Sequence, residues 1–365
     1  MDFGLTEQEE ILRRSAREFL EAECPTSLVR QAEESGEGHA RELWRKIAGL
    51  GWLGISLPEQ LGGTGGSLTD QTVLFEEIGR ALTPGPLLTS SVLAAQIVLI
   101  AGNDDQKTAL IPGVISGEVI LTLARGDRLE TASRDGGLTL SGDSLFVPYA
   151  GLATNIICAT RPAIRAWPDT TLVLVDPKAD GVTMTSMESI ANYPQFLVDF
   201  DDVPLPDASV LGQTAEGMQA LDLAVRRATV AQCAATLGRA QKVLEMVVEY
   251  AGHRVAFGRP IGTFQAVQHR CADLRVAVDG GRMLTYQAAW KLDQGLTADD
   301  EVSMAKAQAG MLSRLATEAG HSIFAGISFT VEHDMQLYSA RAKISEANLG
   351  DTEYHLDRLA AQMGP

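Results

Sequence analysis

The stretch from Cys233 to Ala251 constrains the fold more than any other part of the sequence. Small and apolar residues recur there every three or four positions for about five helical turns, which places them on one face of a long helix. The stripe consists of Cys233, Leu237, Ala240, Leu244, Val247 and Ala251. Similar stripes begin at Leu274 and at Ala305. Because long helices with small-residue faces pack closely, the sequence predicts a helical bundle from residue 213 to residue 365.

The two segments before the bundle have different textures. Residues 1–115 are predicted to be helical, starting with a capping box in which Glu9 follows Thr6 by three positions. Residues 116–212 contain short β-branched runs divided by glycine and aspartate turns, a pattern typical of a small antiparallel β domain. The fold class is therefore mainly α with a central β domain. Its three parts are an N-terminal helical domain, a middle β domain and a C-terminal four-helix bundle.

Charge and cysteine content exclude several classes of function. The net charge of −17 disfavours nucleic acid and anionic membranes as partners. The four cysteines have no paired spacing, so neither a disulfide framework nor a metal site is expected. No apolar run approaches the roughly 18 residues of a membrane span, and residues 1–6 lack the basic and apolar parts of a signal peptide. We therefore expect a cytoplasmic protein.

Several local motifs lie at characteristic places along the chain. The most specific is the string R-x-x-F-G-x-x-I-x-x-F-Q, which runs from Arg254 to Gln265. Others are Pro58-Glu59-Gln60-Leu61-Gly62-Gly63 near the N-terminus and Phe329-Thr330-Val331-Glu332-His333-Asp334 near the C-terminus. With the helix, β and bundle order, these motifs make the chain resemble the acyl-CoA dehydrogenase family.

The resemblance implies an FAD-dependent α,β-dehydrogenation of an acyl-CoA thioester. A carboxylate removes the α-proton, and the flavin accepts the β-hydride. In the family, the counterparts of Arg254 and Gln265 reach the FAD held mainly by a neighbouring subunit, and arginine offers several fixed donors to a pyrophosphate. The structural alternative is that both residues only hydrogen-bond the loop between two bundle helices. Phe257 and Phe264 fit either cofactor contact or packing.

Other flavin segments of the family are eroded in this chain. The family pattern Q-x-x-G-G-x-G corresponds to residues 322–328, where only Gly326 is retained and Ser322 and Ala325 replace the glutamine and the first glycine. In the β domain, Pro148 stands where the family has the threonine that meets the flavin, and it has neither hydroxyl nor N–H. Phe146 could stack near the ring or pack in the core.

The usual catalytic glutamate is missing. Counting from Ile344 puts Leu349 at its position, and alignment on Thr352 puts Gly350 there. The other position used by the family falls near Ala228. Asp351 is the nearest substitute, either as a base or as the cap of the following helix. Three further residues of that helix are expected on a solvated face or an interface: Glu353, His355 and Asp357.

Three hypotheses of function follow from the family motifs that the chain retains and from those that it has lost. In the first, the chain is the non-catalytic partner in an α2β2 heterotetramer with a second acyl-CoA dehydrogenase chain. Such complexes act on steroid side-chain or branched acyl-CoA and pass electrons to an electron-transferring flavoprotein. In the second, the chain is a self-sufficient homotetrameric enzyme with Asp351 as base. In the third, it is a non-catalytic acyl-CoA-binding pseudoenzyme.

Overall fold

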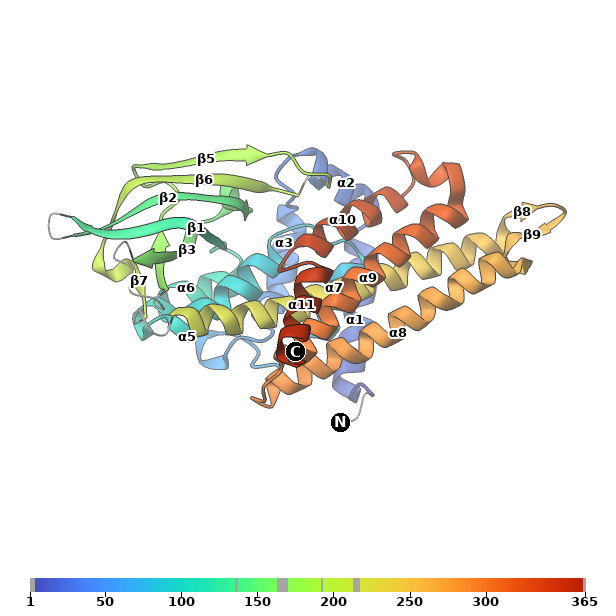
Figure 1. Ribbon diagram of the computed structural model, residues 1–365, viewed down its shortest axis with the longest axis horizontal. Coiled ribbons are helices and arrows are strands. Elements are labelled where there is room, and N and C mark those ends of the chain that lie inside the picture. The colour runs from blue at the N-terminus through green and yellow to red at the C-terminus, as the bar shows by residue number, and fades with distance from the viewer. Residues whose placement is uncertain (1–3, 135–136, 163–169, 192, 213–216, 364–365) are drawn as a thin grey trace. The chain divides into compact units, whose positions relative to one another are not determined.

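The computed structural model describes residues 4–134, 137–162, 170–191, 193–212 and 217–363 (Figure 1). By its internal contacts the chain divides into two compact units. One comprises residues 1–30, 67–83 and 229–365, and the other residues 31–66 and 84–228. The three-domain division expected from the sequence remains a prediction, and its boundary after Gly212 falls at residues 213–216, outside the described residues.

The first unit is a bundle of helices. It contains α1 (Glu7–Glu23), α4 (Leu68–Arg80), α8 (Gln265–Asp293), α9 (Asp299–Phe324), α10 (Met335–Ala347), α11 (Thr352–Met363), the start of α2 (Thr26–Glu34) and, from Thr229 onward, α7 (Gly217–His253). The predicted capping box of α1 is confirmed, since Thr6 and Glu9 exchange hydrogen bonds. All six residues of the predicted stripe on α7 are buried. The 3–4 spacing therefore marked the core face correctly.

Two glycines allow α4 and α7 to cross at very short range. A Cβ on Gly79 would lie 1.9 Å from Ala235 O, and one on Gly238 would lie 1.7 Å from Glu76 O. The carboxylate of Glu76 is buried beside this crossing, where Arg282 of α8 donates to it at 2.5 Å and the hydroxyl of Tyr286 at 3.2 Å. The close approach thus depends on the missing side chains, and the buried charge is paired.

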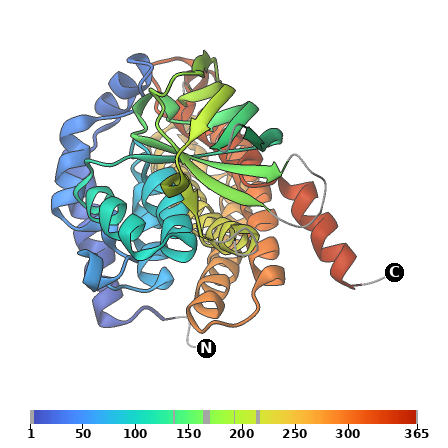
Figure 2. The ribbon, with the colours of Figure 1, turned by 90° about the vertical axis from the view of Figure 1, so that its left-hand side faces the viewer.

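The second unit combines a sheet with short helices. In its described residues seven strands form one sheet in the order β5-β6-β2-β1-β3-β4-β7. The strands are β1 (Leu121–Arg134), β2 (Gly137–Pro148), β3 (Asn155–Pro162), β4 (Thr171–Val175), β5 (Val182–Met187), β6 (Gln195–Leu205) and β7 (Val210–Leu211). Five of the six described pairings are antiparallel as predicted, and β1 with β3 is parallel. Figure 2 shows these strands fanning out with the usual sheet twist.

Besides its strands, this unit contains short helices and single turns. They are α3 (Arg41–Gly49), α5 (Ala95–Ala101) and α6 (Asp104–Ser116), with the single turns η1 (Trp52–Gly54), η2 (Glu59–Leu61), η4 (Ala150–Leu152) and η5 (Asp207–Ser209). Within the N-terminal stretch predicted to be helical, one segment forms a π-helix, η3 (Leu87–Ala94), which the sequence did not predict. Ser90 Oγ there accepts a hydrogen bond from Leu121 N of β1 at 3.0 Å, which anchors the widened turn to the sheet.

Candidate functional site

A two-stranded hairpin follows α7 and carries the most specific motif of the sequence. Strands β8 (Val255–Ala256) and β9 (Arg259–Pro260) are joined by Phe257 and Gly258, both with positive φ, of 52° and 79°. Positive φ at both central residues matches the backbone twist of a tight hairpin, but it strains a bulky residue. Phe257 is nevertheless 95% exposed. A strained and exposed ring at a hairpin tip is suited to contact with another molecule rather than to packing within this chain.

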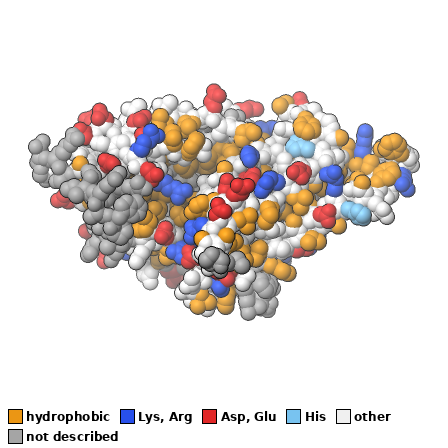
Figure 3. Space-filling model, in the orientation of Figure 1, with side chains coloured by type: hydrophobic (Ala, Val, Ile, Leu, Met, Phe, Trp, Pro, Cys, Tyr) orange, Lys and Arg blue, Asp and Glu red, His pale blue; other side chains and the backbone are white. Residues whose placement is uncertain are grey.

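The side chains around the hairpin are cationic and aromatic. Arg254 is exposed and forms no ion pair with any residue that the structure describes. Arg259 lies 4.4 Å from the centre of the Phe264 ring, which meets the Phe257 ring edge-on at 6.1 Å. Figure 3 shows hydrophobic side chains mixed with Lys, Arg and His around the hairpin that Figure 1 labels β8 and β9. This cationic tip contrasts with the acidic charge of the whole chain.

Gln265 begins α8 directly after the 3-10 turn η6 (Ile261–Thr263), and its side chain is exposed. The loop is bonded by other groups: Gln268 Nε2 donates to Gly262 O at 2.9 Å, and Ile261 N donates to Arg254 O at 2.8 Å. The structural alternative, in which the Gln265 and Arg254 side chains bond this loop, thus finds no contact among the described residues. Both side chains are available to an anionic ligand.

The eroded flavin segment keeps the backbone of a glycine-rich turn. Ala325 ends α9 with φ 55° and ψ −138°, a region that is essentially restricted to glycine. Gly326 follows in η7 (Ala325–Phe329), is exposed, and has no atom within 4 Å of where a Cβ would be. Ser322 Oγ accepts a hydrogen bond from Arg270 of α8 at 3.0 Å. The turn therefore leaves free space beside Gly326, and it requires a strained backbone conformation at Ala325.

The corner between α10 and α11 is where the resemblance places the catalytic glutamate. Leu349 has φ 60° and Gly350 has φ 94°. The ammonium of Lys306, which is 1% exposed, donates to the carbonyls of Ser345 at 3.2 Å, Glu346 at 2.9 Å and Gly350 at 2.6 Å. Burial lowers the pKa of Lys306. No sequence pattern pointed to this buried lysine, because it lies 43 positions before Leu349.

None of the candidate positions for the catalytic glutamate, which are Leu349, Gly350 and Ala228, carries an acidic side chain. Asp351 Oδ1 accepts a hydrogen bond from Tyr354 N at 2.9 Å, which is the capping geometry weighed as its alternative role. Ala228 is buried. The expectation that His355 lies on a solvated face or an interface is wrong: it is 4% exposed, and its Nε2 lies 3.0 Å from Leu349 O. Burial is the main cause of its lowered pKa.

The β-domain turn that the resemblance places beside the flavin has proline at the position of the family's threonine. The carbonyl of Pro148 accepts from Thr122 Oγ1 at 2.6 Å, and proline offers no N–H. Phe146 has φ 60° and is 58% exposed, so core packing is not its role. Tyr149 is buried and has φ 54°. The residues present therefore fit a pyrophosphate-bearing ligand at the hairpin, but they do not fit the ring of a flavin at this turn.

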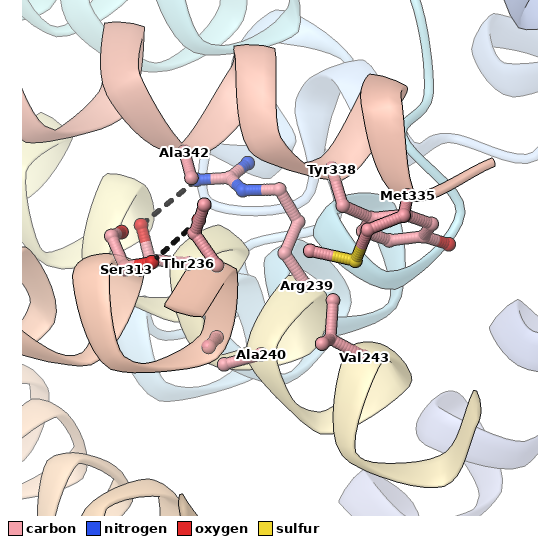
Figure 4. A pocket seen from close by; sticks show the side chains of 10 residues that line it. Thr236, Arg239, Ala240, Val243, Ser313, Met335, Tyr338 and Ala342 are labelled. Carbon is pink, nitrogen blue, oxygen red and sulfur yellow. Dashed lines mark hydrogen bonds between the residues drawn. The ribbon is translucent and has the colours of Figure 1, made fainter. Parts of the chain in front are cut away.

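A small cavity of about 10 Å³ lies within the bundle between α7, α9 and α10 (Figure 4). That is about the room for one water molecule. Arg239 reaches into it and donates to Thr236 Oγ1 at 2.8 Å and to Ser345 Oγ at 2.7 Å. This cavity is too small to hold an acyl chain.

The cysteines, the possible metal ligands and the apolar helices of the described residues can be compared with the remaining expectations. Cys24, Cys158 and Cys233 are buried and unpaired, and burial raises the pKa of each thiol. No group of His, Cys, Asp and Glu in the described ranges could hold a metal ion. No helix among these residues is long and apolar enough to cross a membrane.

Comparison with known proteins assigns the family. Residues 6–118 match the model of the acyl-CoA dehydrogenase N-terminal domain, and residues 216–364 match that of the C-terminal domain. The acyl-CoA dehydrogenase IpdE2 of Mycobacterium tuberculosis is 30% identical over 98% of each chain. The ChsE4-ChsE5 complex from the same organism is similar with a TM-score of 0.92 and 27% identity, covering 100% of this chain and 99% of that one.

A variant of the Tcur3481-Tcur3483 steroid ACAD is also similar, with a TM-score of 0.88 and 28% identity over 98% of each chain. The predicted fold class is confirmed. FAD as the cofactor of the family is also confirmed. The chain belongs to the acyl-CoA dehydrogenase family of CH–CH oxidoreductases.

Proposed function

We propose that this chain is the non-catalytic subunit of an FAD-dependent acyl-CoA dehydrogenase. It lends cofactor contacts to a partner chain that carries the base and most of the flavin site. The observation that carries the proposal is the corner at Leu349 and Gly350, which Lys306 braces. Neither of these two residues has a carboxylate, and the carboxylate of the adjacent Asp351 accepts the capping bond from Tyr354 N. A weak carbon acid requires a base within proton-transfer reach, and here the partner must supply it.

The hairpin supports the cofactor half of the proposal. Arg254, Gln265 and the tip residue Phe257 are exposed, and Gly326 leaves room for close approach of a ligand. We assign the binding and orientation of the FAD pyrophosphate side to these four residues. When bound, FAD accepts the hydride removed from the β-carbon of the thioester. The part of this chain is to position that cofactor.

An exposed face of α8 supports the partner half of the proposal. Ala272, Val276, Gly280 and Met283 recur at helical spacing, and Val276 and Met283 are 72% and 56% exposed. Small and apolar residues on an open helix face are suited to close packing against another helix. Two of the similar structures are named for pairs of chains, ChsE4-ChsE5 and Tcur3481-Tcur3483. We propose an α2β2 assembly of the same kind.

The substrate and electron acceptor belong to the same proposal. The steroid ACAD among the similar structures favours a steroid side-chain or branched acyl-CoA as substrate. An electron-transferring flavoprotein is the proposed acceptor, and the cytoplasm is the proposed compartment.

Coexpression with a second acyl-CoA dehydrogenase chain that has a glutamate at its base position tests the proposal. The lone chain is expected to purify with little FAD and no activity, and the complex with both. Arg254→Gln should weaken FAD binding by about tenfold or more, the worth of a hydrogen bond to a charged group. Arg45→Gln is the matched control, because Arg45 is an exposed arginine that pairs with Glu42 three residues away and lies far from Arg254 in the sequence. Stoichiometric FAD with turnover in the lone chain would contradict the proposal.

Two alternatives are separated by the same preparations. If the lone chain were a homotetrameric enzyme with Asp351 as base, Asp351→Asn would abolish its turnover. If it were a pseudoenzyme, the lone chain would bind acyl-CoA tightly without a partner. The capping bond from Tyr354 N to Asp351 favours neither alternative, since a capping carboxylate already has a structural role.

A further inference from the structure

The hairpin of β8 and β9 presents two arginines on one face. In its register Ala256 lies opposite Arg259, and the neighbouring pair is Val255 with Pro260. Residues opposite each other in an antiparallel pair point to the same side, and successive residues along a strand point to opposite sides. The ladder continues to Arg254, whose carbonyl accepts the next cross-strand hydrogen bond at 2.8 Å. Arg254, Ala256 and Arg259 therefore share one face of the hairpin.

The two arginines lie close enough to act on one ligand. They are diagonal neighbours across the hairpin, which puts their Cα atoms on the order of 7–8 Å apart. Ala256, which shares their face, has only a methyl group as its side chain. Both arginines are exposed, and neither forms an ion pair with a residue that the structure describes. Two guanidinium groups this close repel each other, so an anion between them satisfies both.

The ring of Phe264 holds the second arginine in place. The guanidinium carbon of Arg259 lies 4.4 Å from the centre of this ring, within the range of a cation–π contact. Phe264 is half-buried directly before α8, and its ring lies at 90° to the ring of Phe257. Arg259 donates no hydrogen bond to the described residues, so its five N–H groups are available to a ligand.

The local charge around the hairpin favours an anion. From Tyr250 to Ala272 the sequence contains no Asp and no Glu, although the net charge of the whole chain is −17. The third arginine of this segment, Arg270, donates to Ser322 Oγ at 3.0 Å and so has another partner. A doubly charged ligand is therefore attracted to the hairpin by its two arginines and not by the chain as a whole.

We infer that Arg259 is a second pyrophosphate-binding residue, which with Arg254 provides one cation for each phosphate of FAD, and that Phe264 is the positioning residue that holds Arg259. The inference rests on the proposed function, because Arg259 meets the cofactor only if this hairpin contacts FAD. Each phosphate of a pyrophosphate diester carries one negative charge, which matches the two guanidinium groups in number. Phe264 acts through Arg259 rather than by touching the cofactor.

The rate of FAD loss from the coexpressed complex tests the role of Arg259. Arg259→Gln should speed FAD loss by about tenfold or more, the effect of a hydrogen bond to a charged group. The control variant Arg45→Gln should leave the rate unchanged, because Arg45 is exposed and paired with Glu42. The effect of Arg259→Gln should shrink as salt rises, since salt screens exposed charges. FAD loss at the wild-type rate in Arg259→Gln would overturn the inference.

A salt bridge to the partner chain is the other use that an assembly could make of an exposed arginine. In that case Arg259→Gln would release free chains, which size-exclusion chromatography separates from the complex, while the remaining complex would lose FAD at the wild-type rate. This outcome would also overturn the inference, because Arg259 would then bind protein and not the cofactor.

A double-mutant cycle tests the role of Phe264. Phe264→Leu should speed FAD loss by about threefold, the effect of one cation–π contact at an exposed site. Phe264→Tyr keeps the face of the ring and should lose FAD at the wild-type rate. In the Arg259→Gln background, Phe264→Leu should have a smaller effect, because the guanidinium that it holds is gone. Equal effects of Phe264→Leu in both backgrounds would overturn the positioning role.

Arg254→Gln, measured in the same complex, reports on the proposed function separately. If Arg254→Gln speeds FAD loss and Arg259→Gln does not, only the further inference fails. If neither variant changes FAD loss, the hairpin does not meet the cofactor, and the proposed function fails as well.

Discussion

Replacing Lys306 by methionine should destabilise the bundle by about 3–5 kcal/mol, the usual effect of removing one member of a buried polar network. The substitution keeps an unbranched side chain, one atom shorter, and removes three hydrogen bonds, leaving the carbonyls of Ser345, Glu346 and Gly350 without their donor. A buried carbonyl without a donor costs about 1–3 kcal/mol. Three such carbonyls cost about 3–9 kcal/mol. Because the wild type already bears the cost of burying the ammonium, the net loss is expected in the lower part of that range, at about 3–5 kcal/mol.

The assay is urea unfolding of the full lone chain followed by circular dichroism, with Lys343→Met as the matched control. Lys343 is an exposed lysine of the same corner and is paired with Glu346 at 3.3 Å, so its loss should change the free energy of unfolding by less than about 0.5 kcal/mol. A Lys306→Met variant within about 1 kcal/mol of wild type would refute the reasoning, because that is less than even one buried carbonyl should cost.

Two further predictions concern strained and buried groups. Ala325→Gly should stabilise the chain by about 1 kcal/mol, since it relieves backbone strain of about 1–3 kcal/mol and loses less to the freer unfolded chain, and a lower urea midpoint than wild type would contradict this. His355 should make the chain less stable in acid. Its folded pKa is lowered, so as pH falls below about 6.5 the unfolded state takes a proton that the folded state does not, and stability present above that pH is lost. Between pH 7.5 and 5.5, His355→Gln should therefore lose less unfolding free energy than wild type, and equal losses would argue against the assignment.

Local patterns predicted much of the fold because their partners lie close in sequence. The stripe on α7 from Cys233 to Ala251 needs only helical periodicity to identify it. The capping box of Thr6 with Glu9 and the cap of Asp351 on Tyr354 N each join residues three apart. Such contacts follow from backbone geometry alone, so a sequence without relatives is enough to find them.

The parts that were missed depend on distant residues or on rare backbone forms. Lys306 meets the corner at Gly350 only after two helices have folded against each other. His321 gains Ser339 across a turn and a loop, and no spacing rule links the two. The π-helix from Leu87 to Ala94 has the composition of an ordinary apolar helix. Among the candidate site residues, the exposed Arg254 and Phe257 were identified from the motif, whereas the residues that hold their loop in place were not.

The tip at Phe257 has a consequence for how such a chain has to be made. An aromatic ring in a strained turn, 95% open to water, gains nothing for a subunit that remains alone. Newly synthesised copies without a companion expose this ring to chance association and to proteases. In the proposed assembly, equal and simultaneous production of the two chains would remove that hazard at its source.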